Sequence, residues 1–212
     1  MKANKKDLKG FSVLILAAGF SGRMGVPKLS LPFDENRTFA AKIIQTYQSA
    51  GCEKIVVVVN RQGREFLQSQ ESFFAESNIS VVFNTFPERE RFYSLLTGLK
   101  TLNDERPVFI QNIDNPFVEP ALLLRLVNAF EPEAFVVPYY NGHGGHPVLL
   151  SGKIVNNLLA SSDYRQNLRD FLQAYPKISC AVEDKKILIN INSLQEYREY
   201  FEKLNQRMSN SD

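Results

Sequence analysis

The feature that most constrains the fold is an apolar segment, Phe11 to Leu16, that leads directly into a glycine-rich loop. A short continuous apolar run is typical of a strand that is buried on both faces of a sheet. The loop contains Gly19, Gly22, Arg23, Gly25 and Lys28. Glycines let the backbone turn tightly, so that backbone amides and the two cations can surround a bulky anion. We interpret this loop as a triphosphate-binding site at the end of the first strand of an α/β domain.

The spacing of the glycines separates this loop from two well-known phosphate-binding motifs. A Walker loop requires G-x-x-x-x-G-K-[ST], and a dinucleotide-binding motif requires G-x-G-x-x-G. This chain has G-x-x-G-x-x-G instead. The simpler alternative is a glycine-rich connection between a strand and a helix, with two cations on its surface.

Length and composition favour one globular domain with small-molecule partners. The 212 residues suit a single domain over 1–212, with residues 1–9 and 206–212 as mobile tails. The formal net charge is +2 and acids and bases are interspersed, which favours neither nucleic acid nor a membrane surface as partner. Cys52 and Cys180 are too isolated for a disulfide framework, which suits a reducing cytoplasm. We therefore expect a cytoplasmic protein.

Hydrophobic patterning predicts that strands and helices alternate through the first two thirds of the chain. The expected strands are 11–16, 54–59, 79–83, 107–113 and 134–138, and the expected helices are 38–50, 62–76, 94–102 and 119–130. This alternation predicts a doubly wound, mostly parallel sheet with helices on both faces.

The last third of the sequence is less regular. We expect a loop at 139–145, short strands at 146–150, 178–182 and 187–191, short helices at 152–159 and 166–174, and a closing helix at 194–204. No segment is long enough to act as a linker between two domains.

Polar or permissive residues follow four of the predicted strands, at the point where each strand ends. These residues are Gly19, Asn60, Asn84 and Asp114. In an open parallel sheet, ligands bind outside the carboxyl ends of the strands, so we expect these four residues to share one ligand-binding rim. Each alone is weak evidence, because Asn and Asp are also ordinary turn residues.

Asp114 is the best candidate for a metal ligand on this rim. It follows the predicted strand in the run Phe109-Ile-Gln-Asn-Ile-Asp-Asn-Pro116. Mg²⁺ is usually held by one or two carboxylates together with substrate phosphates. The alternative is a turn-forming or helix-capping aspartate before Pro116.

Three segments together resemble a known family. Residues 14–28 resemble the loop L-A-A-G-x-[SG]-x-R-M-G-x-x-K of the MobA-like nucleotidyltransferases, residues 109–116 resemble the G-D-Q-P metal motif, and residues 142–149 contain the G-H-P-V segment. The resemblance implies a fold of the nucleotide-diphospho-sugar transferase type and Mg²⁺-dependent transfer of a nucleotide from an NTP. Two residues depart from the metal motif, Ile113 in place of glycine and Asn115 in place of glutamine.

The resemblance also implies roles for further residues. Asn192 occupies the place of a second metal ligand, although Asn192 or Ser193 can equally cap the last helix. His146 would orient an acceptor phosphate or a loop, or would be a structural histidine. Ala17 and Ala18 lie in the nucleotide-binding loop.

One segment matches the family poorly. Only Ser94 corresponds in the run Glu90-Arg-Phe-Tyr-Ser94, which replaces G-M-S-x-S. Arg89 and Arg91 could meet an anionic acceptor, but we favour a solvated start of a helix, since surface charges usually have no other role.

These residues lead to a hypothesis of nucleotidyl transfer. The loop, with Gly19, Gly22, Arg23 and Lys28, would hold the phosphates, while Asp114 and Asn192 would hold Mg²⁺. Ala17-Ala18 resembles the cytidylyl branch, so CTP is favoured over GTP. The acceptor that the family implies is molybdopterin, with a sugar phosphate as the alternative. A nucleotide-binding module without turnover and a purely structural α/β domain are the competing classes.

Overall fold

The computed structural model describes residues 7–19, 24–70, 78–86, 90–102, 105–161 and 167–209, with side chains as far as Phe201 apart from Glu90. Gly22 and Arg23, both assigned to the phosphate loop, lie outside the described residues, as do Met1 to Lys6.

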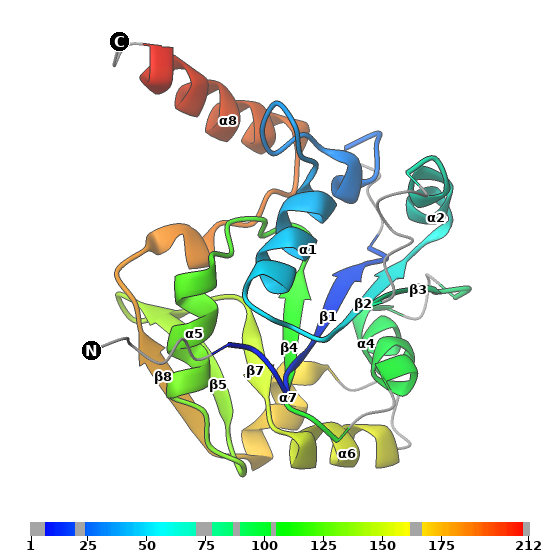
Figure 1. Cartoon of the computed structure of the whole chain (residues 1–212), viewed down its shortest axis with the longest axis vertical. Coiled ribbons are helices and arrows are strands. Elements are labelled where there is room, and N and C mark those ends of the chain that lie inside the picture. Colours follow the sequence, from blue (N-terminus) through cyan, green and yellow to red (C-terminus); the bar gives the residue numbers. More distant parts are fainter. Residues whose placement is uncertain are drawn as a thin grey trace.

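The strands of the described chain form one mixed sheet of eight strands (Figure 1). They are β1 (Ser12–Ala17), β2 (Lys54–Val59), β3 (Ile79–Phe83), β4 (Val108–Asn112), β5 (Phe135–Tyr140), β6 (His143–Gly144), β7 (Val148–Leu150) and β8 (Lys177–Ala181). The order is β3-β2-β1-β4-β7-β5-β6, with β8 beside β5. The pairs β2·β3, β1·β2, β1·β4 and β5·β8 are parallel, whereas β7 runs antiparallel to both β4 and β5.

Helices cover both faces of this sheet. They are α1 (Phe39–Ser49), α2 (Arg61–Gln68), α4 (Glu90–Leu102), α5 (Pro120–Asn128), α6 (Gly152–Ala160), α7 (Leu168–Phe171) and α8 (Leu194–Ser209), with 3₁₀ turns η1 (Lys28–Ser30), η2 (Leu172–Ala174) and η3 (Lys185–Leu188). The helices α1 and α5 share one hydrophobic cluster with one face of the sheet, and α4 and α6 share a second cluster with the other face. The expected doubly wound, mostly parallel fold is confirmed.

The alternating sides of β1 explain the two clusters. Val13 and Ile15 belong to the α1 side, whereas Leu14 and Leu16 belong to the α4 side. All six residues of β1 are buried, as a strand at the centre of a two-faced sheet requires. The first phosphate-loop residue therefore follows a fully enclosed strand.

Most element boundaries agree with the sequence prediction. Thr38 caps α1 by accepting a hydrogen bond from the Ala41 amide, and Gly51 follows the helix with φ +89°. The strands β2 and β3 have the expected bounds. The predicted helix 62–76 is too long, since α2 ends at Gln68, and residues 71–77 lie outside the described chain.

Two predicted elements in the last third are wrong. The sequence predicts a loop at 139–145, but Tyr139 and Tyr140 extend β5 and pair with β6. Asn141 and Gly142 join these strands with φ +45° and +87°, as a two-residue hairpin turn with positive φ at both positions requires. The sequence predicts a strand at 187–191, but η3 ends there and the chain continues as an irregular segment.

Two helix ends also differ from expectation. The helix α4 begins at Glu90 rather than at Ser94, so the segment that matches the family poorly is the first turn of a helix. The helix α8 continues to Ser209 rather than ending at Leu204, so residues 206–209 are helical.

An aromatic cluster attaches the start of α8 to the domain. Its ring centroids lie 4.6 to 6.4 Å apart. Its members are Phe33, Phe39, Phe117, Tyr197, Tyr200 and Phe201. Phe117 follows the β4 end and Phe39 begins α1, so the cluster fixes α8 close to the rim of the sheet, from which the rest of the helix extends outward (Figure 1).

No described helix combines the length and the apolar character that crossing a bilayer demands.

Gly98 shows how closely α4 packs on the sheet, and it provides a test of that packing. A Cβ atom there would lie 2.2 Å from Leu14 Cδ1 and 2.7 Å from Val58 Cγ2. Alanine is about 1 kcal/mol better than glycine inside a helix. We expect Gly98→Ala nevertheless to lower the free energy of unfolding by about 1–2 kcal/mol, because overpacking a filled core outweighs that gain. Urea unfolding measures the change.

Thr101→Ala, on the exposed side of the same helix, is the matched control and should change stability by less than about 0.5 kcal/mol. A Gly98→Ala protein as stable as the wild type would show that α4 does not pack as closely as described.

Candidate active site

The carboxyl ends of the four parallel strands meet at one rim of the sheet. In the register of the sheet, Ala17 pairs with Val59 and Val59 pairs with Phe83, while Leu16 pairs with Asn112. The sequence candidates Gly19, Asn60, Asn84 and Asp114 follow these strand ends within one or two residues. The structure therefore places all four on the same rim.

Two of the four residues, Asn60 and Asn84, form hydrogen bonds that hold neighbouring segments of the rim in place. Asn60 caps α2 through the Gly63 amide and donates from Nδ2 to the Gly19 carbonyl at 3.1 Å. Asn84, 2% exposed, donates to the Ser94 hydroxyl at 2.8 Å. Because these side chains already have partners inside the protein, their geometry supports positioning of the loop and of α4.

The described part of the phosphate loop is anchored at both ends. Ala17 and Ala18 are buried where β1 ends, and Met24 is buried at the far end, just before Gly25 with φ +69°. Gly19 has open space where a Cβ would stand. The loop therefore begins and ends in the core while its first glycine faces free space.

Lys28, Asp114 and Asn192 converge beside this loop. Lys28 Nζ donates to Asn192 Oδ1 at 2.8 Å and lies 3.5 Å from Asp114 Oδ2. These residues come from η1, from the end of β4 and from the segment before α8, which are far apart in the sequence. The structure thus brings together three residues that the sequence assigned to phosphate and metal binding.

Asn192 reaches this position because the preceding segment is bound to the end of β4. The Ile191 amide donates to the Asp114 carbonyl at 2.8 Å. The side-chain Nδ2 of Asn115 lies 2.7 to 3.2 Å from three backbone carbonyl oxygens, those of Lys186, Ile187 and Ile189. Asn115 is only 1% exposed, so this residue, which replaces the family's glutamine, has a structural reason to carry an amide.

The alternative interpretation of the 192–196 segment as a helix cap also holds. Ser193 Oγ accepts from the Glu196 amide at 3.1 Å, and Glu196 Oε2 accepts from the amides of Asn192 and Ser193. This is a capping box, which fixes the start of α8. Since the Asn192 side chain is not needed for the cap, it remains directed at Lys28.

The residues present suit a divalent ion shared with substrate phosphates. Asp114 Oδ1 is buried and has no hydrogen-bond partner in the described part of the chain. A buried carboxylate oxygen without a partner is costly unless a ligand completes it. No group of three or more His, Cys, Asp or Glu side chains gathers among the described residues, so substrate oxygens would have to supply the remaining ligands.

Ile113, the other departure from the metal motif, does not enter the rim. Its side chain is 7% exposed and belongs to the hydrophobic cluster on the α1 side. Its amide donates to the Leu16 carbonyl at 3.2 Å, which continues the β1·β4 ladder by one residue.

A hydrogen-bonded chain connects α4 to the histidine loop across the end of β4. The Arg91 guanidinium donates to Asn112 Oδ1, and Asn112 Nδ2 lies 2.8 Å from His146 Nε2. Because guanidinium has only donors, the Asn112 oxygen must face Arg91 and its nitrogen must face the histidine. His146 Nε2 therefore accepts, and the ring proton resides on Nδ1.

The surroundings of His146 keep it neutral. Burial, together with the positive charge of Arg91, lowers the pKa of His146 from 6.5 to about 4, although Asp114 opposes the shift. At neutral pH, His146 can therefore orient a neighbour by hydrogen bonding but contributes no positive charge.

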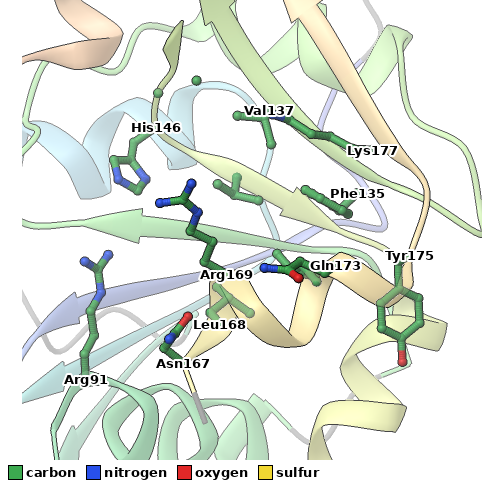
Figure 2. Close-up of a pocket in the computed structure, with 14 residues that line it drawn as sticks. Arg91, Phe135, Val137, His146, Asn167, Leu168, Arg169, Gln173, Tyr175 and Lys177 are labelled. Carbon is green, nitrogen blue, oxygen red and sulfur yellow. The ribbon is translucent and has the colours of Figure 1, made fainter.

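A cavity of about 720 Å³ lies beside this row of hydrogen bonds (Figure 2). Arg91 and His146 line it together with residues of β5, β7, α7, η2 and β8. Arg91 is an exposed residue in the first turn of α4, as the interpretation of a solvated helix start expects, but its guanidinium also binds Asn112 beside this cavity. Arg89 lies outside the described residues.

Sequence reasoning missed several residues of this site. Asn112 and Asn115 flank Asp114 in the sequence, and their position at the end of a buried strand was a usable signal. Arg169 and Lys177 line the cavity, but they lie in the irregular last third and carried no motif.

Comparisons with known proteins identify relatives of the whole domain. The sequence model of the MobA-like NTP transferase domain matches residues 13–178. The chain is 23% identical over 190 residues to the molybdenum cofactor cytidylyltransferase of Escherichia coli, covering 90% of this chain and 95% of that protein.

Solved structures share the fold. A nucleotidyl transferase from Methanothermobacter superposes with a TM-score of 0.73 at 21% identity, covering 93% of this chain and 98% of that one. Rv0371c from Mycobacterium tuberculosis, described in a complex with manganese, superposes with a TM-score of 0.68 at 20% identity, covering 89% and 96% of the two chains.

The low pKa of His146 predicts a loss of stability in acid. Its pKa is about 4 in the folded state and 6.5 when unfolded, so below pH 6.5 the unfolded state takes up the proton first. The contribution is complete above pH 6.5 and falls as pH decreases toward 4. We expect a loss of about 2 kcal/mol from His146 between about pH 7.5 and pH 5, measured by urea unfolding.

His146→Gln should remove this part of the pH dependence, because glutamine can still accept from Asn112 but does not titrate. His143→Gln, at the exposed histidine of β6, is the control and should retain it. An unaltered pH dependence in His146→Gln would show that this histidine is not held neutral.

Proposed function

The chain belongs to the MobA-like NTP transferase family and is therefore a nucleotidyltransferase, and we propose that it transfers a nucleoside monophosphate from CTP to a small phosphorylated acceptor in the presence of Mg²⁺. Pyrophosphate is the second product. The single observation that carries this proposal is the meeting of Lys28, Asp114 and Asn192 at the end of β4, beside the glycine-rich loop.

The proposed reaction is an in-line displacement at the α-phosphorus. An oxygen of the acceptor phosphate forms a bond to the α-phosphorus, and the bond from that phosphorus to the oxygen bridging to the β-phosphate breaks. Pyrophosphate leaves with the electron pair. Because a phosphate oxygen is already ionised, no general base is needed, and the protein contributes mainly position and charge.

The chain's own residues divide these tasks. Gly19 and the neighbouring loop amides would bind the β- and γ-phosphates, and Lys28 would neutralise charge on the α-phosphate and on the leaving pyrophosphate. Asp114 and Asn192 would hold Mg²⁺, which when bound supplies charge stabilisation at the α-phosphate. Gly22 and Arg23 are assigned to the phosphates from sequence alone. Asn60 would hold the loop in place through Gly19, and the hydrogen bond between Asn84 and Ser94 would hold α4 in place.

His146 would act on the acceptor side. It lies across Asn112 from Arg91, and it is neutral at physiological pH. It would therefore orient the acceptor by hydrogen bonding, while Arg91 supplies charge to the attacking phosphate.

CTP is the proposed donor and GTP the alternative. Ala17-Ala18 precedes the loop, and Ala18 is 5% exposed where the guanylyl branch has glycine. The similarity to a protein named as a cytidylyltransferase supports the same choice. That protein's name also supports a molybdopterin acceptor, while a sugar phosphate is the alternative acceptor.

Replacing Asp114 tests the proposed chemistry. We expect Asp114→Asn and Asp114→Ala to lower kcat by about 100-fold or more, because each removes a charge that acts in the transition state. The measurement is pyrophosphate release with each of the four NTPs and Mg²⁺, over a panel of acceptors that includes molybdopterin and sugar 1-phosphates. CTP should give the highest kcat/KM in the wild type.

Asp34→Asn is the matched control, since Asp34 lies on an exposed turn with Arg37 and should leave turnover unchanged. Full turnover in Asp114→Asn would exclude Asp114 from the chemistry. Tight CTP binding without pyrophosphate release on any acceptor would favour a nucleotide-binding module without turnover.

A further inference from the structure

The cavity beside His146 is lined by several cationic residues. Three of its lining residues are Arg91, Arg169 and Lys177, and none of its described lining residues is acidic. The whole chain has a formal net charge of only +2. A cavity of about 720 Å³ lies within the usual size range of small-molecule sites, so this charge is concentrated where a ligand would fit.

The three cations approach the cavity from three different elements. Arg91 is on α4, Arg169 on α7, and Lys177 begins β8. In Figure 2 the guanidinium groups of Arg91 and Arg169 are both directed toward the side of the cavity where His146 lies. Lys177 Nζ lies 5.6 Å from the centre of the Tyr139 ring and close to Gly144.

Two of these cations have no carboxylate partner among the residues that the structure describes. Neither Arg169 nor Lys177 lies within ion-pair distance of a carboxylate in the described part of the chain. Arg91 binds the neutral amide of Asn112. Like charges that face one cavity repel one another, and a ligand with more than one negative charge would relieve that repulsion.

Much of the rest of the cavity wall is apolar, although His146, Asn167 and Gln173 also line it. Phe135 and Val137 on β5, Val148 on β7, and Leu168 and Leu172 contribute side chains to it. Phe135 and Val137 are 7% and 8% exposed, so this part of the wall consists of side chains that are packed into the hydrophobic core. An apolar wall with separated charges suits a ligand with an apolar body and charged ends.

We propose that this cavity selects acceptors that carry a second anionic group in addition to the phosphate that attacks the nucleotide, on an apolar body. Arg91, beside the end of β4, receives the attacking phosphate, and Lys177 and Arg169 receive the second anion. This inference rests on the proposed function, because it identifies the class of acceptor for the same reaction.

Binding of simple probes tests the selectivity without turnover. Isothermal titration of the full chain compares phenyl phosphate with 4-carboxyphenyl phosphate, which adds one carboxylate to the same ring. We expect the wild type to bind the carboxylated probe roughly 10-fold more tightly, since a charge-assisted contact is gained. Lys177→Gln and Arg169→Gln should each reduce this preference by roughly 5-fold or more and leave phenyl phosphate binding within about 2-fold.

Lys153→Gln is the matched control, because Lys153 lies on α6, is paired with Glu133 and does not line the cavity. It should leave the preference unchanged. Equal affinity for the two probes, failure to bind either, or an equal loss for both probes in Lys177→Gln would overturn the proposal.

CTP binding measured on the same proteins separates this inference from the proposed function. Lys177→Gln and Arg169→Gln should bind CTP like the wild type, since both residues lie on the acceptor side. A wild type that prefers the carboxylated probe but does not bind CTP would contradict the proposed function while leaving the cavity's preference intact.

Discussion

The site depends on the hydrogen bonds that join the end of β4 to the 186–191 segment. The buried Asn115 amide lies within hydrogen-bonding distance of three carbonyl oxygens of that segment, and the Ile191 amide returns to the Asp114 carbonyl. The same segment holds the histidine loop, because the His146 amide donates to the Ile187 carbonyl at 3.1 Å. A Cβ at position 145 would lie 2.4 Å from that carbonyl oxygen, so only glycine allows this approach. One irregular segment thus positions both Asn192 and His146.

The end of β4 divides the site into two halves with different electrostatic character. Asp114 faces Lys28 and Asn192, on the side where the triphosphate and a divalent ion would bind. Two residues earlier, Asn112 faces Arg91 and His146, on the side of the cationic cavity. Residues two apart in an extended chain point the same way, but the chain leaves the strand at Ile113 and turns. Nucleotide and acceptor can therefore meet at one strand end while each keeps its own charged surroundings.

The fold was predictable from the sequence where local pattern and tertiary environment agree. Lys54 to Val59 is a β-branched run typical of a buried strand, and of the two possible caps for the first helix, Asn36 and Thr38, the structure uses Thr38. Asn141-Gly142 is a typical sequence for a hairpin turn, but the glycine and tyrosine residues around it led to the prediction of a loop. The 187–191 segment has the composition of a strand, but its carbonyl groups bind Asn115 and His146 instead of a neighbouring strand.

The site was predictable only in part for a related reason. Strand ends on a parallel sheet share a rim by topology, so Gly19 and Asp114 could be placed together from sequence. The cavity instead is lined by residues of α4, β5, α7 and β8, and no local sequence pattern indicates that residues so far apart in the chain line one cavity. Arg91 illustrates this, since its role depends on Asn112, which lies on a different element.

The most direct test of this account is the binding of Mn²⁺ in the presence of α,β-methylene CTP, followed by electron paramagnetic resonance. The account predicts that the wild type and Asp34→Asn bind the ion together with the analogue, and that Asp114→Asn weakens ion binding by roughly 10-fold or more, since the only charged protein ligand proposed for the ion is lost. Mn²⁺ binding of equal strength in Asp114→Asn would contradict the claim that the end of β4 holds the metal.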